Sequence, residues 1–366
     1  MSKYKLCEIG FFKNGLNFSA DKVDSGCKII GIPDFGDKYV ANIDGLKEIN
    51  SEIVTSDYYL KENDILLVRS NGNKNLVGRS MIIGEINEPV SFSGFCIRFR
   101  VTNNQVLPLY VLYLLKSPLF RKLFSNTQQT SISNLNQDIL GNIEFDIPSL
   151  NEQHKIVEIL HSITLKIETN EKINDNLYQM AMTEYMHMFF NKKANSKFGN
   201  HIVEQPKSTI QVNQAQESEG TVPFFTSGDA ILTWPTPLVS GRNIFLNTGG
   251  NADVKFYIGD SAYSTDTWCI TAKDDLTDYL YLFLQSIKLE LNLKFFLGTG
   301  LKHLQKPMLK DRPIYIPSTV ELKKFNDDVM PLMSMISDNV RESKALTSLR
   351  DWLLPMLMNG QATITD

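Results

Sequence analysis

The stretch "IPSLNEQHKIVEIL" at 147–160 has a near counterpart in "IPSTVELKKFNDDVM" at 316–330. In both stretches, Ile-Pro-Ser leads directly into a long run of mixed charged and apolar residues that is typical of an amphipathic helix. The two Ile-Pro-Ser triplets lie 169 residues apart. This spacing indicates an internal repeat in which the same entry into a helix occurs twice.

The offset of 169 residues holds without a gap over some seventy residues, in which at least ten further identical pairs fall on it. Examples are Tyr110 with Tyr279, Leu135 with Leu304, and Leu140 with Leu309. Upstream the offset drifts, and we align the "FCI" at 95–97 with the "WCI" at 268–270, at an offset of 173. The chain is therefore predicted to be a tandem duplication of a globular region followed by a helix.

Both helical runs carry a seam whose positions alternate by four and three residues, as in a coiled coil. The first seam is Ile156, Leu160, Ile163, Ile167, Asn170, Asn174, Leu177 and Ala181, and the second is Phe325, Val329, Leu332, Ile336, Asn339, Ser343, Leu346 and Arg350. Both seams become polar at their midpoints. Asn170 and Asn339 would approach each other only between antiparallel helices, where they would fix the register.

Each helix is expected to span about forty residues, or roughly 60 Å. Two prolines in the second helix, Pro331 and Pro355, predict a kink and a late break. The globular regions place β-prone runs around Gly/Asn turns, at 64–84 and 241–259. The predicted fold class is α+β, with two β-rich mixed globular domains separated by two long antiparallel helices. The boundaries are 1–149, 150–190, 197–317 and 318–366.

Composition excludes several classes of protein. The 366 residues carry a net charge of −4, and no apolar run is long enough to span a bilayer. We therefore expect a cytoplasmic protein whose contacts with DNA, if any, are local or shared with a partner. The four cysteines form no Cys-x-x-Cys pair, and the five histidines have no ligand spacing. No metal site is expected.

The residues also argue against catalysis by this chain. It has no phosphate-binding loop and no Pro-Pro pair, so it lacks the Asn/Asp-Pro-Pro-aromatic stretch with which amino-methyltransferases hold a flipped base. The glycine-rich "NTGGNA" at 247–252 is interpreted as a strand-to-strand turn. We expect no catalytic residue and no cofactor on this chain.

Three segments, 65–84, 101–137 and 291–310, contain basic residues and no acidic ones. Asn, Gln, Ser and Thr surround them. Arginine reads guanine, Asn and Gln read adenine, and Lys, Ser and Thr hold phosphates. The candidate DNA-binding residues are Arg69, Ser70, Asn71, Asn73, Lys74, Arg79, Arg121, Lys122, Gln128, Thr226, Ser227, Asn247, Lys255, Lys302, His303 and Lys306. Any one segment could be a solvated loop, but recurrence in both halves favours DNA.

The whole chain resembles the specificity subunit of Type I restriction-modification systems. The most specific stretches are "IPSLNEQHKIVEIL" with the following "KIETNEKINDNLYQMAMTEYM", and the C-terminal "LRDWLLPMLMNG" from Leu349. "VPFFTSGD", "NTGGNADVKF" and "GTGLKHLQKPMLKD" are similar to the target recognition domains of that family.

The resemblance implies two target recognition domains that each read half of a bipartite double-stranded DNA site. It implies that two long antiparallel helices, conserved in that family, hold the domains apart and dock two methyltransferase subunits. The assembly can add two restriction subunits, and S-adenosylmethionine, ATP and Mg²⁺ would bind to the partners. The alternative hypothesis is a protein-protein scaffold with two divergent binding modules, whose contacts would lack the steep salt dependence of DNA binding.

Overall fold

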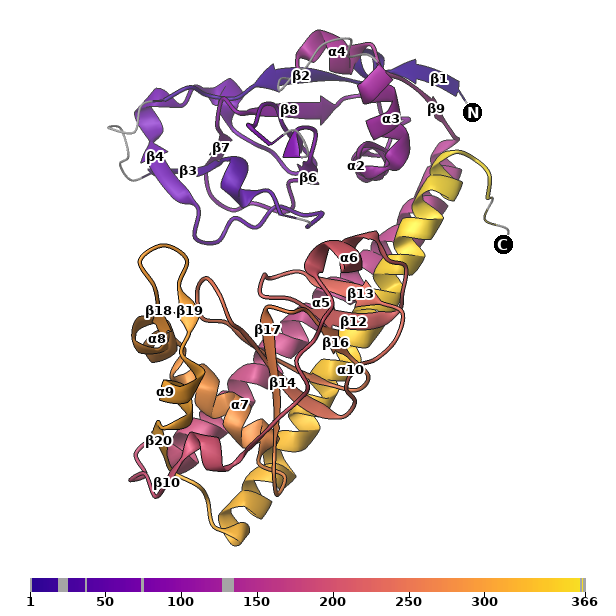
Figure 1. The fold of residues 1–366 in the computed structure, drawn as a ribbon. Coiled ribbons are helices and arrows are strands. Elements are labelled where there is room, and N and C mark those ends of the chain that lie inside the picture. The colour runs from indigo at the N-terminus through magenta and orange to yellow at the C-terminus, as the bar shows by residue number, and fades with distance from the viewer. Residues whose placement is uncertain are drawn as a thin grey trace. The chain divides into compact units, whose positions relative to one another are not determined.

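The computed structural model describes residues 2–18, 26–36, 38–73, 76–126, 135–362 and 364. The chain forms two compact units, one of Met1–Ile167 with Ala345–Asp366 and the other of Glu168–Lys344. Helices α5 (Leu150–Phe189) and α10 (Thr319–Met358) each belong partly to one unit and partly to the other (Figure 1). No helix in the described ranges is long and apolar enough to cross a membrane.

The first unit combines short strands with short helices. Its elements are β1 (Ser2–Lys5), α1 (Leu6–Ile9), β2 (Gly10–Asn14), β3 (Gly26–Ile30), β4 (Lys47–Asn50), β5 (Ile65–Val68), β6 (Ser80–Ile82), β7 (Val90–Phe92), β8 (Cys96–Val101), α2 (Pro108–Lys116), α3 (Pro118–Asn126), α4 (Gln137–Gly141) and β9 (Glu144–Ile147). The sheets have the strand orders β2-β8-β5-β6, β4-β3-β7 and β1-β9.

The second unit repeats this plan. Its elements are β10 (Ser196–Lys197), β11 (Ile202–Glu204), α6 (Val212–Glu217), β12 (Val222–Phe225), β13 (Ile231–Trp234), β14 (Arg242–Asn247), β15 (Val254–Ile258), β16 (Ala262–Tyr263), β17 (Thr267–Ala272), α7 (Thr277–Ser286), α8 (Lys288–Glu290), the π-helix η7 (Leu291–Phe295), β18 (Phe296–Leu297), β19 (His303–Leu304), α9 (Lys306–Lys310) and β20 (Pro313–Ile314). Its sheets have the orders β11-β17-β14-β15, β13-β12-β16, β10-β20 and β18-β19.

The two units therefore share one topology. In both, the four-stranded sheet is antiparallel throughout, and the three-stranded sheet combines one antiparallel pair with one parallel pair. Strand β3 corresponds to β12, β5 to β14, and β8 to β17. The predicted tandem repeat and α+β fold class are confirmed.

Backbone hydrogen bonds correct the predicted alignment upstream of the helices. The Leu135 N–H donates to the Arg69 carbonyl oxygen at 2.8 Å, and the Leu304 N–H donates to that of Thr248 at 3.0 Å. The N–H groups of Arg69 and Thr248 donate in turn to Phe95 and Asp266. Phe95 thus corresponds to Asp266, at an offset of 171 and not 173. The predicted alignment is therefore wrong by two residues. A shift of two along a strand leaves every side chain on the same face of the sheet, so the hydrophobic pattern does not reveal it.

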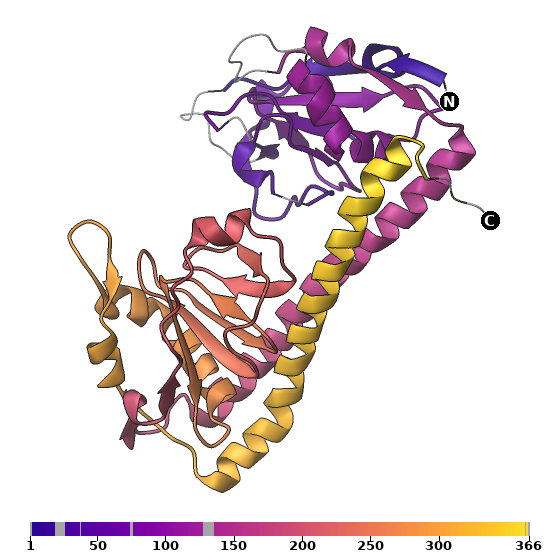
Figure 2. The same ribbon diagram turned by 45° about the vertical axis from the view of Figure 1, so that its right-hand side comes forward.

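Buried helices connect the sheets to the long helices. In the second unit, α7 is buried from Thr277 to Leu284 and shares a core with Phe189 of α5 and Phe325 of α10, whose rings lie 5.2 Å apart. In the first unit, α2 occupies the corresponding place, and the Tyr113 hydroxyl lies 3.2 Å from that of Thr164 on α5. Figure 2 shows α5 and α10 side by side along both cores.

A buried ion pair also joins the sheet of the second unit to α10. Arg242, at the start of β14, binds the Asp278 carboxylate and donates to the Ser334 hydroxyl of α10 at 2.8 Å. Burial raises the pKa of Asp278 to about 6, although Arg242 opposes the shift. Losing Arg242 would leave the buried Asp278 carboxylate without its partner, which makes the pair a strong constraint on how the sheet meets the helix.

Contacts along the seam show that α5 and α10 are antiparallel, as predicted. Asn170 donates to Ser343 at 3.2 Å and to Glu342 at 2.7 Å, and Asn339 donates to Asn174 at 2.8 Å. Each asparagine thus binds the polar seam residue one turn from the other asparagine. We retain the prediction that Asn170 and Asn339 set the register.

The predicted late break in α10 is wrong. The helix continues through Pro355 to Met358. Proline removes one backbone hydrogen bond, but Leu354, Leu357 and Met358 are buried in the core of the first unit. Burial of these side chains keeps the last turn helical.

Both long helices begin with a capping box, in which the first serine and a glutamate three residues later bind each other's backbone N–H groups. The Ser149 N–H donates to the Glu152 carboxylate at 3.0 Å, and the Ser318 N–H donates to that of Glu321 at 2.8 Å. This pairing explains why Ile-Pro-Ser recurs with glutamate at the same distance.

Replacing the cap should weaken α10. We expect Ser318→Ala to lower the free energy of unfolding by about 1 kcal/mol, measured by urea titration. The Ser318 N–H and hydroxyl lower the pKa of Glu321 to about 2. The cap therefore stabilises the fold above the ordinary glutamate pKa, and its contribution is lost as pH falls toward 2.

The control is Ser348→Ala, an exposed position in the interior of α10 where alanine favours the helix. Equal stability of the Ser318→Ala variant and the wild type at pH 7 would show that the cap contributes nothing.

Candidate nucleic-acid interface

Three loops meet at one end of the sheets in each unit, and we call this region the loop end. Among the described residues, it comprises 31–34, 69–73, 76–79 and 93–95 in the first unit, and 226–230, 248–253 and 264–266 in the second. The same bonds join the loops in both. The Ser93 N–H donates to the Ile30 carbonyl at 2.9 Å, and the Ser264 N–H donates to that of Phe225 at 2.9 Å. Equivalent loops are therefore held in equivalent places.

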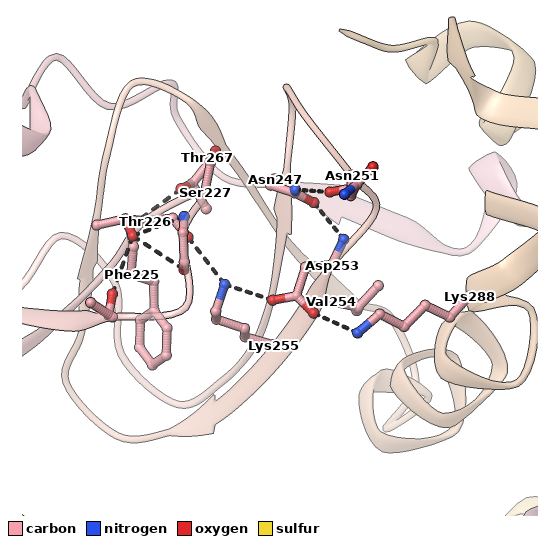
Figure 3. Close-up of polar contacts among 12 residues, drawn as sticks. Phe225, Thr226, Ser227, Asn247, Asn251, Asp253, Val254, Lys255, Thr267 and Lys288 are labelled. Atoms are coloured by element: carbon pink, nitrogen blue, oxygen red, sulfur yellow. Dashed lines mark hydrogen bonds and ion pairs between the residues drawn. The ribbon is translucent and has the colours of Figure 1, made fainter. Parts of the chain in front are cut away.

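Asn247 organises the loop that follows β14. Its side-chain amide donates to the carbonyl oxygens of Gly249, at 3.2 Å, and Asn251, and its side-chain oxygen accepts from the Asp253 N–H at 2.6 Å (Figure 3). Gly250 in the same loop has φ +82°, a conformation that favours glycine. Asn247 is 3% exposed. Its polar groups shape the loop from inside.

Lys255 and Thr226 connect this loop to the one after β12. The Lys255 ammonium donates to the Thr226 carbonyl at 3.2 Å and lies 2.7 Å from the Asp253 carboxylate (Figure 3). The buried Thr226 hydroxyl donates to the Ala230 carbonyl at 3.1 Å. Burial disfavours the ionised form of Asp253, but Lys255 and Lys288 outweigh burial and lower its pKa. Lys255 and Thr226 thus serve the loop's internal structure.

The β18–β19 hairpin brings further predicted residues to the loop end of the second unit. The Gly250 N–H donates to the Lys302 carbonyl at 2.9 Å, and His303 forms a β-bridge with Gly249. The side chains of Lys302 and His303 are exposed, and Ser227 is half-buried. Lys306 follows on α9, with its ammonium 4.9 Å from the centre of the Trp268 ring. Lys302 and His303 are therefore the exposed members of this group of predicted residues.

In the first unit, Arg69 connects two loops of the loop end. Its guanidinium donates to the Gly94 carbonyl at 3.3 Å, and its backbone N–H donates to Phe95 at 2.8 Å. Asn71 accepts from the Asn73 N–H at 2.8 Å, which closes a turn in the loop. Arg69, Ser70, Asn71 and Arg79 are half-buried and Asn73 is exposed.

The remaining predicted residues lie elsewhere. Arg121 and Lys122 are exposed on α3, which is not one of the three loops. Lys74 and Gln128 fall outside the described residues. In the described ranges no group of three His, Cys, Asp or Glu side chains could hold a metal ion.

The sequence did not indicate that the turns at 93–96 and 264–267 belong to the loop end. Their composition carries no basic signal, and the offset of 173 had placed Phe95 opposite Trp268. The equivalence of Phe95 and Asp266 depends on the backbone hydrogen bonds described above.

Asn247→Ala should loosen the loop after β14. We expect it to lower the free energy of unfolding by about 1–3 kcal/mol, because buried backbone groups of the loop lose their partner. The measurement is urea unfolding followed by Trp fluorescence. Asn251→Ala is the matched control, since the Asn251 side chain is exposed and contributes only its backbone carbonyl to the loop. Equal stability of both variants would contradict this role of Asn247.

A protein-family model described as the Type I restriction modification DNA specificity domain matches residues 2–179 and 200–327. The chain is 28% identical over 155 residues to the StySPI specificity subunit of Salmonella potsdam, a match that covers 40% of this chain and 32% of that protein. It is 22% identical over 309 residues to the MjaIX specificity subunit of Methanocaldococcus jannaschii, with 73% and 72% covered.

A solved structure has a similar fold over the full length. The S subunit of a Type I restriction-modification system from M. genitalium aligns with a TM-score of 0.62 at 14% identity, and the alignment covers 100% of this chain and 96% of that one.

Proposed function

The chain belongs to the family of Type I restriction-modification specificity subunits, and we propose that each of its two units reads one half of a bipartite double-stranded DNA site through its loop end. The observation that carries this proposal is that one hydrogen-bonded frame occurs twice with different side chains. The first unit places the half-buried Arg69 and Asn71 there, and the second places the exposed Lys302 and His303. The same backbone frame with different side chains in each unit would suit two half-sites of different sequence.

Charge at the loop end of the second unit favours contact with phosphates. Asp253 is neutralised by Lys255 and Lys288, at 2.7 and 2.8 Å. The exposed side chains of Lys302 and His303 can then face an anionic backbone. Phosphate contacts position a protein on DNA, and neighbouring polar side chains read the bases.

Lys302→Ala should weaken DNA binding by the assembled methyltransferase for all sequences alike. We expect the slope of log affinity against log salt to fall by about 1, since one fewer counterion is released. Fluorescence anisotropy between 50 and 200 mM salt measures it.

Lys273→Ala is the matched control, because this exposed lysine follows the opposite end of β17 from the loop end. An unchanged slope for Lys302→Ala, or an equal change in both variants, would remove the hairpin from the DNA interface. A slope of zero for the wild type would favour the scaffold hypothesis.

The exposed apolar residues of the long helices support docking of partner subunits. On α5 they include Leu165, Ile173 and Met180, and on α10 they include Met335, Leu349 and Trp352. Met180 and Leu349 are equivalent in the repeat, and are 57% and 43% exposed. Equivalent surfaces on two helices can bind two copies of one partner. We propose that these are two methyltransferase subunits, which would carry S-adenosylmethionine. Restriction subunits, where present, would carry ATP and Mg²⁺.

A charged residue at the exposed surface around Met180 or around Leu349 should prevent one methyltransferase subunit from binding. We expect Met180→Glu and Leu349→Glu each to reduce the methyltransferase subunits per chain from two to one, because a buried carboxylate without a partner is costly at an interface. Native mass spectrometry of the co-expressed complex gives the count. Glu171→Lys is the control, since Glu171 is exposed on the opposite side of α5 from Met180. Two subunits retained by both glutamate variants would exclude these surfaces.

One feature favours the scaffold hypothesis as a second candidate. Leu289, Leu293 and Leu301 of the second unit are 74%, 64% and 65% exposed. Clustered exposed leucines are typical of protein contacts. Binding of a protein partner by this unit with little salt dependence would support that hypothesis.

A further inference from the structure

The turn at 93–96, "SGFC", and the turn at 264–267, "STDT", have the same hydrogen-bonded frame. The second residue of each turn donates its N–H to a preceding segment, Gly94 to Leu16 at 2.8 Å and Thr265 to Ile210 at 2.9 Å. The fourth residue donates to the first, at 2.8 Å in one unit and 3.1 Å in the other. With the bonds from Ser93 and Ser264 described above, the frame fixes the position of the third residue in both turns.

The third residue of each turn is exposed, and its chemistry differs completely between the units. Phe95 in the first unit is 59% exposed, and the equivalent Asp266 in the second is exposed. Neither residue is among the predicted DNA-binding residues. An aromatic ring exposed at a turn gains nothing from water, and a carboxylate in a DNA-facing loop is repelled by phosphates. A base edge with matching chemistry would make either side chain favourable at this position.

Several hydrogen bonds fix the backbone of Asp266. Its carbonyl oxygen accepts from the Thr248 N–H at 2.9 Å, from the Thr248 hydroxyl at 3.0 Å and from the Ser227 hydroxyl. Thr248 also accepts from Leu304, next to Lys302 and His303 in the hairpin. In the first unit, the Phe95 carbonyl accepts from Arg69, whose guanidinium binds the adjacent Gly94. Hydrogen bonds thus fix the backbone of both tips and connect it to the segments that carry Arg69 in one unit and Lys302 and His303 in the other.

The chemistry of base edges supplies a partner for each tip. In the major groove, an apolar side chain contacts the thymine methyl group, and an aspartate accepts a hydrogen bond from the cytosine amino group. Such contacts require a rigid backbone, because a mobile side chain would lose more entropy on binding. The carboxylate of Asp266 can approach DNA favourably through this amino group, while Lys302 on the neighbouring hairpin contacts the phosphates.

We propose that Phe95 and Asp266 are equivalent base-reading residues, with Phe95 contacting a thymine methyl group in one half-site and Asp266 accepting from a cytosine amino group in the other. This inference rests on the proposed function, and it names the residues that make the two half-sites different. The same backbone frame would then read a different base in each unit, because the side chain at the third position of the turn differs.

The test uses the complete methyltransferase assembly and the bipartite site found by mapping methylated motifs. Duplexes replace each thymine of the site in turn by uracil, which lacks the methyl group, and each cytosine by 2-pyrimidinone, which lacks the amino group. We expect the wild type to lose about fourfold in affinity at one uracil, the effect of one buried methyl group. It should lose at least about fivefold at one 2-pyrimidinone, the lower bound for one base contact.

Phe95→Ala should abolish the sensitivity to that uracil alone, and Asp266→Asn should abolish or reduce the sensitivity to that 2-pyrimidinone alone. The two positions should lie in different half-sites. Phe11→Ala and Asp274→Asn are the matched controls, because they change an exposed ring and an exposed carboxylate at the opposite ends of β8 and β17. Asp274 has φ +54°, which asparagine tolerates.

Variants that keep the wild-type pattern of sensitivities would overturn the inference, as would two sensitive positions in one half-site. In either case the wild-type assembly would still read a bipartite site, and the proposed function would stand. If the wild-type assembly shows no sequence preference for DNA, the proposed function itself fails.

Discussion

The antiparallel packing of α5 against α10 is the constraint on which the rest of the structure depends. Each compact unit contains part of both helices, so neither core is complete without two segments that are remote in the sequence. Phe189 with Phe325 in one unit, and Leu160 with Leu354 in the other, are buried by this arrangement. We expect the polar centre of the seam to cost stability but to oppose slippage, because Asn170 binds Ser343 and Asn339 binds Asn174 in this register.

Contacts with this helix pair position the sheet of each unit. In the second unit, the buried Arg242 and Asp278 pair connects β14 and α7 to α10, and in the first unit α2 packs against α5. A sheet held at one end can carry variable loops at the other without loss of its core. This separation explains how two units with little sequence similarity outside the helices retain the same strand order.

The proposed function depends on different side chains carried by the same backbone frame. The turns around Phe95 and Asp266 show the principle at the scale of one residue, since identical backbone bonds present an aromatic ring in one unit and a carboxylate in the other. The surfaces around Met180 and Leu349 are alike instead of different, because both equivalent positions are apolar and exposed. Sites that bind two copies of one partner must be alike, whereas sites that read two DNA sequences must differ.

The sequence by itself determined the repeat, the helix pair and its antiparallel direction, because seam periodicity and the recurring Ile-Pro-Ser are local patterns. It also contained both capping boxes, as serine followed three residues later by glutamate. Only the tertiary structure decided which polar residues face outward. Asn247, Thr226 and Lys255 are predicted to contact DNA, and the structure shows that they also make hydrogen bonds within the loop end, while Phe95 and Asp266 gave no signal in the sequence. The reason is physical: composition reports how polar a loop is, but backbone hydrogen bonds between distant strands decide where each side chain points.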